Sequence, residues 1–127
     1  MVKLFLLFAS INGMIAVILG AFGAHALKAK ISPALLAAYQ TGTHYHLIHV
    51  LSLMGLALLI LRLSDSTPAP LIAAGFLWMA GTVLFSGSLY GLALGAPNSF
   101  GPITPVGGLL LIIGWLCFAI GIARSSL

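Results

Sequence analysis

The side chains best suited to proton transfer or metal binding are concentrated in one short stretch of the chain. His44, Tyr45, His46 and His49 lie within a few residues of one another. An imidazole ring can relay protons, ligate a metal or haem iron, or act as a hydrogen-bonding group in a protein interior. Residues three or four positions apart share a face of an α-helix. His46 and His49 therefore point the same way, whereas His44 projects from another side.

Two polar seams follow from the same helical spacing. On a helix that turns by about 100° per residue, the first seam covers an arc of roughly 80° and consists of Thr41, Tyr45, His49 and Ser52, with His46 at its edge. The second seam has four-residue spacing and consists of Thr82, Ser86 and Tyr90. Polar groups inside a membrane are costly unless they are paired. We therefore predict that both seams face the interior of the protein.

Three interpretations of His46 and His49 remain open from the sequence. Neutral imidazoles that are hydrogen-bonded to a neighbouring helix would lock a helix bundle together. A line of polar side chains could instead carry protons or a small solute, and a histidine pair could ligate a metal or haem. No cofactor is predicted, although a haem or metal ligated by His46 and His49 is not excluded. Asn12, another polar residue in an apolar stretch, must also find a partner in the bundle.

The composition defines the environment in which these side chains work. Hydrophobic residues make up 61 % of the chain and charged residues 5 %, whereas about a quarter of the residues in soluble proteins are charged. A water-soluble surface cannot be built from this composition, so the lipid bilayer is the predicted partner. The few lysines and arginines are scattered singly, and no nucleic-acid partner is expected.

Four segments are long and apolar enough to cross a bilayer. About 20 helical residues span a hydrocarbon core of about 30 Å, and the segments are residues 4–24, 43–62, 71–94 and 103–123. Lipid provides no partners for unpaired strand groups, and the segments do not alternate between polar and apolar residues. The sequence thus predicts an all-α integral membrane protein, a four-transmembrane-helix bundle, with residues 1–127 forming a single domain.

Capping residues refine the helix boundaries. Ser32 and Pro33 suit the start of a helix, so the second helix should begin near residue 33, with Tyr39 and Gln40 partly hydrated at the interface. Thr104 and Pro105 predict the start of the fourth helix in the same way. Turns are expected at residues 64–68 and 95–102, which are rich in Ser, Pro, Gly and Asn.

Small residues recur at helical spacing in three of the spans. The first span combines Gly13 and Gly20 with alanines on one face; the other glycine stripes are Gly87, Gly91 and Gly95 in the third span and Gly107, Gly114 and Gly121 in the fourth. Close backbone approach at small residues supplies much of the packing between membrane helices. We predict helix packing at these glycines, and association through any stripe left uncovered, giving a homo-oligomer or a complex with another membrane protein.

Basic residues indicate the topology by a narrow margin. A cytoplasmic N-terminus places Lys3, Arg62 and Arg124 inside and leaves Lys28 and Lys30 outside. We therefore predict that both termini are cytoplasmic, with insertion in both orientations as the alternative. The first span also resembles a secretory signal ending near Leu27, but it is longer than a typical signal core and carries the small-residue stripe. We therefore predict that residues 1–24 are retained as a membrane helix.

Several catalytic classes lack the residues that they need. No span has an acidic or strongly basic residue at its centre, and neither a phosphate-binding glycine loop nor a nucleophile–base–acid set can be assembled from the sequence. An ATP-driven pump is excluded, and the central carboxylate of small multidrug exporters has no counterpart. Enzymatic activity is not expected.

Four motifs resemble those of a known family. They are residues 20–28 (GAFGAHALK), residues 39–42 (YQTG) followed by Tyr45, His46 and His49, residues 84–90 (LFSGSLY) and residues 103–108 (ITPVGG). Together they resemble the YgdD-like inner membrane proteins, a bacterial family of unknown function related to a small eukaryotic transmembrane protein. The resemblance implies a multi-pass protein of the bacterial cytoplasmic membrane, and it brings no established activity.

The sequence leaves three functional classes. The leading hypothesis is a non-enzymatic packing or accessory protein of the membrane. The second is a small transporter or channel that uses the polar seams. The third is a haem- or metal-binding redox protein.

Overall fold

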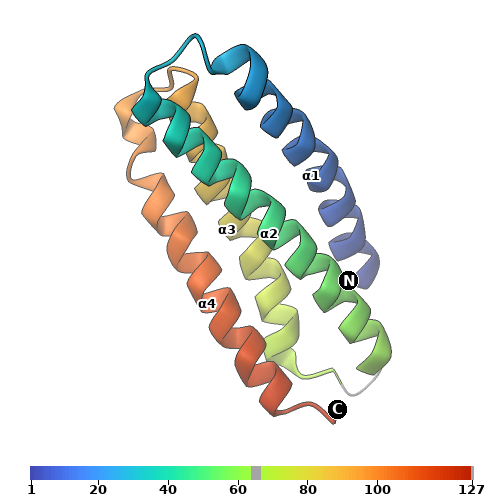
Figure 1. Cartoon of the computed structure of the whole chain (residues 1–127). Coiled ribbons are helices and arrows are strands. Elements are labelled where there is room, and N and C mark those ends of the chain that lie inside the picture. The colour runs from blue at the N-terminus through green and yellow to red at the C-terminus, as the bar shows by residue number, and fades with distance from the viewer. Residues whose placement is uncertain (64–66, 127) are drawn as a thin grey trace.

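Four long helices make up most of the protein. The computed structural model describes residues 1–63 and 67–126. The long helices are α1 (Val2–Phe22), α2 (Pro33–Leu63), α3 (Ala69–Ala93) and α4 (Ile103–Ala123). A π-helical segment, η1 (Gly23–Leu27), extends α1, and a short 3-10 helix, η3 (Asn98–Phe100), precedes α4. The helices run alternately up and down (Figure 1), and four of them are long and apolar enough to cross a membrane, which confirms the predicted fold class.

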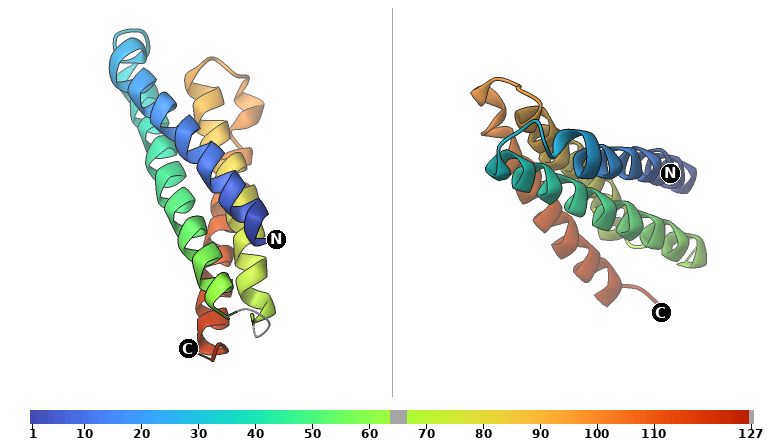
Figure 2. Two further views of the ribbon diagram at one scale, coloured as in Figure 1. Left: turned by 90° about the vertical axis from the view of Figure 1, so that its right-hand side faces the viewer. Right: turned by 45° about the horizontal axis from the view of Figure 1, so that its top comes forward.

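Each helix packs against the next one along the chain. The contact between α3 and α4 is the most extensive, and α1 packs chiefly against α2. The α2 and α3 helices are therefore the central pair, and more of their surface is buried than that of α1 or α4. The largest buried side chains of the core include Phe5, Leu53, Leu71 and Trp78. The view in the left half of Figure 2 shows α1 crossing in front of the bundle, with its N-terminal end beside α3.

The α2 helix begins where its capping residues predict. The Leu35 backbone N–H donates to Ser32 Oγ at 3.3 Å, and Pro33 occupies the first helical position, where its missing N–H costs nothing. Tyr39, however, was expected at a hydrated interface and is instead only 1 % exposed. Its ring reaches across to α1, so the first turns of α2 already belong to the bundle.

A glycine ends α3. Gly95 adopts φ +95°, a left-handed conformation that side-chain-bearing residues rarely adopt. The Ala96 N–H then donates to the Gly91 carbonyl at 2.8 Å and the Gly95 N–H donates to Leu92 at 3.3 Å, which is the Schellman arrangement. Gly95 was predicted as part of a packing stripe, and its role here is to terminate the helix.

The α4 helix starts where the fourth predicted span starts, but two residues earlier than its capping residues predict. It begins at Ile103, after Pro102, and no side chain caps it. Thr104, the predicted cap, uses its hydroxyl for a bond of 2.7 Å to Ser88 Oγ on α3. A hydroxyl facing a neighbouring helix can join two helices, which the local sequence pattern does not reveal.

The glycines of α4 lie in its contact with α3. A Cβ atom added at Gly107 would overlap the Phe85 backbone, one at Gly114 would overlap the Trp78 ring, and one at Gly121 would overlap Leu71. Gly13 and Gly20 face α2 at ordinary to tight contact distances from Val50 and Thr43.

The predicted α3 stripe needs correction. A Cβ at Gly87 would meet nothing within 4 Å in the described structure, and one at Gly91 would meet Phe100 of η3 rather than another long helix. The glycines of α3 that allow close approach are Gly75, against Phe5, and Gly81, against Leu111. Glycine spacing alone cannot distinguish these two faces. Of the turn predicted at residues 64–68, residues 64–66 lie outside the described residues.

Candidate functional site

His46 joins three helices at the centre of the bundle. Its Nε2 lies 3.2 Å from Asn12 Oδ1 on α1, and its Nδ1 lies 3.1 Å from Tyr90 Oη on α3. The Asn12 amide nitrogen donates to the Phe8 carbonyl at 3.0 Å, which orients the amide so that its oxygen faces the imidazole. That oxygen can only accept, so His46 donates from Nε2, and a neutral His46 ring then accepts the Tyr90 hydroxyl proton at Nδ1.

His49 makes the corresponding link to the fourth helix. Trp115 Nε1 on α4 donates to His49 Nε2 at 3.1 Å, and His49 Nδ1 lies 2.8 Å from the Tyr45 carbonyl one turn earlier. The indole nitrogen is only a donor and the carbonyl only an acceptor. His49 therefore carries its proton on Nδ1 and leaves Nε2 free to accept.

The two histidines tie α2 to every other long helix. Both are 4 % exposed, and both rings use each of their nitrogens in a hydrogen bond that a neutral imidazole satisfies. A further link comes from Ser86 Oγ, which donates to the Gly42 carbonyl at 2.7 Å and joins α3 to α2. Pairing of this kind offsets the cost of burying polar groups in a bilayer.

The first predicted seam is rotated away from the interior. Thr41 and Tyr45 are exposed and Ser52 is half-buried. The Thr41 hydroxyl donates to Ala37 and that of Ser52 donates to Ile48, each to a carbonyl of its own helix. The buried face of α2 instead follows the line of Tyr39, Gly42, His46, His49 and Leu53. Its mean direction lies about 85° from that of the seam on the helical wheel, and His49 is common to both. A hydroxyl that satisfies itself within its helix needs no interior partner, and for this reason the prediction was wrong for Thr41 and Ser52. It was also wrong for Tyr45, whose side chain is 42 % exposed.

The second predicted seam lies on the buried face of α3. Thr82, Ser86 and Tyr90 are 3 %, 1 % and 8 % exposed. Tyr90 and Ser86 face α2 through the bonds described above, and Thr82 has no hydrogen-bond partner among the described residues. Tyr45 keeps a peripheral place, with its ring centroid 5.0 Å from that of Phe85 and its plane stacked on His49.

Tyr39 is a linking residue that the sequence patterns did not identify. Its hydroxyl donates to the Leu19 carbonyl on α1 at 2.6 Å, and its ring lies so close to Gly23 that any side chain there would overlap it. The same carbonyl also accepts from the Gly23 N–H, at the point where α1 widens into η1. Tyr39 lies three residues before Gly42 and seven before His46, so helical spacing places all three on one face of α2. This spacing was the sequence signal that could have identified Tyr39.

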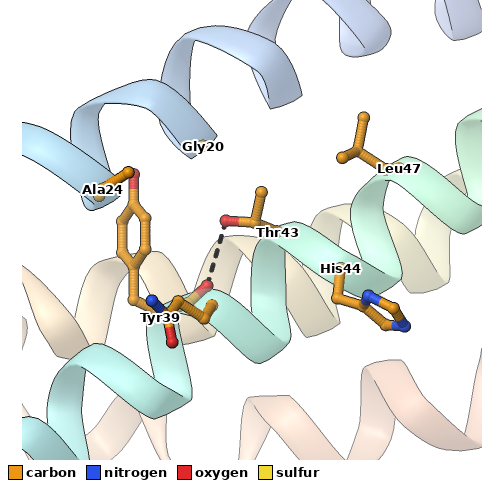
Figure 3. A pocket seen from close by; sticks show the side chains of 8 residues that line it. Gly20, Ala24, Tyr39, Thr43, His44 and Leu47 are labelled. Atoms are coloured by element: carbon orange, nitrogen blue, oxygen red, sulfur yellow. Dashed lines mark hydrogen bonds between the residues drawn. The ribbon is translucent and has the colours of Figure 1, made fainter.

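A cavity of about 250 Å³ lies beside Tyr39, between the end of α1 and the first half of α2. Figure 3 shows the Tyr39 phenol pointing toward α1 near Ala24, and the Thr43 hydroxyl bonded to the Tyr39 carbonyl. His44 also lines this cavity, and in the figure its ring turns away from α1. His44 is exposed and is thus separate from the His46 and His49 network.

Aromatic rings surround His49. Trp78 and Trp115 approach each other to 4.7 Å between ring centroids, and both rings lie edge-on to His49 at 6.2 Å. Trp78 Nε1 is buried without a hydrogen-bond partner in the described structure, pressed against Gly114. Within residues 1–63 and 67–126, no three His, Cys, Asp or Glu side chains are placed to hold a metal ion together.

The comparisons with known proteins agree with the fold. Residues 19–108 match the family described as protein of unknown function (DUF423). The chain is 42 % identical to the UPF0382 membrane protein YwdK of Bacillus subtilis, covering 96 % of this chain and 98 % of that protein. It is 45 % identical to the UPF0382 membrane protein SAB0533 of Staphylococcus aureus, with 93 % of each covered.

A third relative extends the comparison to another bacterial group. The chain is 39 % identical to the UPF0382 inner membrane protein YgdD of Escherichia coli, covering 96 % of this chain and 91 % of that protein. No solved structure matches the chain significantly. Four apolar helices and relatives named as membrane proteins together identify a multi-pass membrane protein. The chain belongs to the DUF423 family of small bacterial membrane proteins.

Proposed function

We propose that this protein is a non-enzymatic membrane component, in which the buried polar residues hold four helices in one fixed arrangement for an accessory role. The observation that supports this is the hydrogen bonding of His46 and His49. Each ring nitrogen is already occupied, and the partners lie on α1, α3 and α4 or on the α2 backbone. A metal, a haem iron or a transported proton would have to displace one of these bonds first.

Substitution of the histidines tests the structural role. His49→Leu and His46→Leu should each lower the free energy of unfolding by about 1–2 kcal/mol, because partners are left unpaired in a low-dielectric interior. His49→Gln should be tolerated better, since an amide retains a donor and an acceptor. Thermal unfolding in detergent measures both effects.

Proteoliposomes distinguish this role from transport. Purified protein should dissipate an imposed pH gradient no faster than protein-free liposomes, and His46→Gln should leave that rate unchanged. A pH-gradient flux that depends on protein and is lost in His46→Gln, in a variant that remains folded, would contradict the structural role and support a proton path.

The same proposal includes an orientation in which both termini are cytoplasmic. The N-terminus of α1 and the C-terminal ends of α2 and α4 lie toward one end of the bundle (Figure 1), which brings Lys3, Arg62 and Arg124 toward one membrane surface. Lys28 and Lys30 follow η1 at the other end. The excess of basic residues favours the cytoplasm for the first group. Reporter fusions at either terminus should be active only inside; activity on both sides would indicate dual insertion.

A further inference from the structure

A groove runs between α1 and α3, which are parallel to each other. Near the start of both helices they are in direct contact, where Phe5 packs against Gly75 and against the Phe76 ring at 5.2 Å between centroids. Toward the other end α1 leans over α2, through the Tyr39 bond to Leu19, and so it leaves α3 (Figure 2). The space that opens between α1 and α3 holds two cavities in succession.

The cavity nearer to the Tyr90 end has a mostly apolar lining that includes several polar side chains, and we call it the polar cavity after them. It has a volume of about 190 Å³, and the side chains that give it polar character are Asn12, His46, Thr82, Ser86 and Tyr90. None of the residues that line it is acidic, lysine or arginine, and a neutral His46 ring satisfies both of its hydrogen bonds. A charged group entering this cavity would lose its hydration without gaining a counter-ion. The cavity therefore favours an uncharged polar group.

Unused hydrogen-bonding capacity points into this cavity. Thr82 lines the cavity and is only 3 % exposed, and its hydroxyl has no hydrogen-bond partner among the described residues. Asn12 uses only one of its two amide hydrogens, on the Phe8 carbonyl. Ser86 donates its hydroxyl proton to Gly42 and keeps its lone pairs. A hydroxyl group can complete all three, because it both donates and accepts.

The second cavity continues the groove with apolar walls. It has a volume of about 470 Å³, shares Val83 with the polar cavity, and is otherwise lined by Phe8, Phe76, Met79, Ala80 and Leu84. From Val83 to Phe76 the helix rises about 10 Å. A polar end followed by an apolar channel of this length matches a molecule with one uncharged head and one hydrocarbon tail.

We propose that the groove between α1 and α3 binds an uncharged, lipid-soluble amphiphile, with a hydroxyl head beside Thr82 and Ser86 and a hydrocarbon tail against Phe8 and Phe76. The ligand enters sideways from the bilayer, since Val83 and Gly87 are exposed at the edge of the groove. Binding leaves the bonds of His46 in place, so the inference does not depend on the proposed accessory role.

Photolabelling in lipid nanodiscs tests the site. The probe is a hexadecanol analogue with a diazirine in its chain, and the labelled residues are located by mass spectrometry. Labelling should concentrate on α1 between residues 8 and 19 and on α3 between residues 76 and 90. Excess hexadecanol should compete, whereas hexadecane, which lacks the head, and hexadecyl phosphate, whose head is charged, should not.

Three variants sharpen the result. Thr82→Val keeps the side-chain shape and should weaken competition by hexadecanol about fivefold, the effect of losing one hydrogen bond. Gly87→Leu should block the groove and abolish labelling there. Gly55→Leu is the matched control, because Gly55 is also an open helical glycine but lines neither cavity; it should label as the wild type does.

Other labelling and competition results would contradict the proposed site. Labelling spread over the lipid-facing sides of all four helices, or left unchanged by Gly87→Leu, would overturn the proposal. Competition by hexadecane as effective as that by hexadecanol would mean that the polar cavity does not recognise the head. Competition by hexadecyl phosphate would mean that the head is not restricted to uncharged groups.

Discussion

At the scale of single residues, the two buried histidines differ although they share a helix face. His46 faces an acceptor at Nε2 and a hydroxyl at Nδ1, whereas His49 faces a donor at Nε2 and a carbonyl at Nδ1. Their neighbours therefore select opposite tautomers. The contrast arises from the groups that α1, α3 and α4 present and from the Tyr45 carbonyl of α2, which bonds His49.

We predict that His46 carries its proton on Nε2 and His49 carries its proton on Nδ1 at neutral pH. Imidazole ¹⁵N chemical shifts of labelled protein in nanodiscs measure this directly. Trp115→Phe removes the donor to His49 and should alter the shifts of that ring, while those of His46 stay unchanged. A charged His49 at pH 7 in the folded protein would contradict the hydrogen bond from Trp115 and would indicate a hydrated cavity.

Glycine positions provide a second prediction at this scale. Gly114→Leu should destabilise the bundle by about 1–3 kcal/mol, because the new side chain must displace the Trp78 ring from a packed interface. Gly91→Leu should have a smaller effect, since its neighbour is Phe100 near the membrane surface. Ala119→Leu, at an exposed small residue of α4, is the control. Thermal unfolding in detergent ranks the three, and equal stabilities would show that α4 does not pack on α3 at Gly114.

At the scale of secondary-structure elements, α1 is attached to the bundle along its whole length. Phe5, Ala9 and Ala16 are fully buried, Asn12 bonds to His46, and the Leu19 carbonyl accepts the Tyr39 hydroxyl. The η1 segment continues from α1 and buries Gly23 and Leu27. Removing α1 would leave His46 Nε2 and the Tyr39 hydroxyl without the hydrogen-bond partners described here.

We therefore predict that residues 1–24 are retained in the mature protein. The mass of the intact protein extracted from membranes should include α1. A product that starts near Leu27 would support the alternative of a cleaved signal, and the hydrogen bonds of His46 and Tyr39 to α1 would then be absent from the mature protein.

At the scale of the whole molecule, α2 presents an uncovered patch to the membrane. Leu51, Met54 and Leu58 are exposed around Gly55, and an added Cβ at Gly55 would meet nothing within 4 Å of the described structure. A glycine at the centre of an apolar helix face allows another helix to approach closely. This patch lies outside the glycine stripes for which self-association was predicted from the sequence, and it is a separate candidate surface.

We predict that copies of this chain associate through α2 around Gly55. Native mass spectrometry from nanodiscs should detect dimers or larger species, and Gly55→Leu should shift the protein toward the monomer. Ala119→Leu, at an exposed small residue of α4, should leave the distribution unchanged. If the protein stayed monomeric at every lipid-to-protein ratio, the prediction would be wrong.

The sequence alone was sufficient for the membrane location, the four spans and the start of α2. These properties depend on local quantities: the length of an apolar run, the absence of charge within it, and a Ser–Pro pair in front of it. It also identified His46, His49 and the α3 seam as buried candidates, since helical spacing is a local property.

Only the tertiary structure decided which polar groups meet. Asn12 and His46 lie 34 residues apart, His46 and Tyr90 lie 44 apart, and His49 and Trp115 lie 66 apart. These pairs depend on the rotation and depth of each helix relative to its neighbours, which side-chain packing over the whole bundle sets. Thr41 and Ser52 lie within about 80° of His49 on a helical wheel, but their hydroxyls bond within α2. His46 and His49 each have at least one hydrogen-bond partner on another helix, so both imidazoles face the interior of the bundle. Thr41 and Ser52 do not face it.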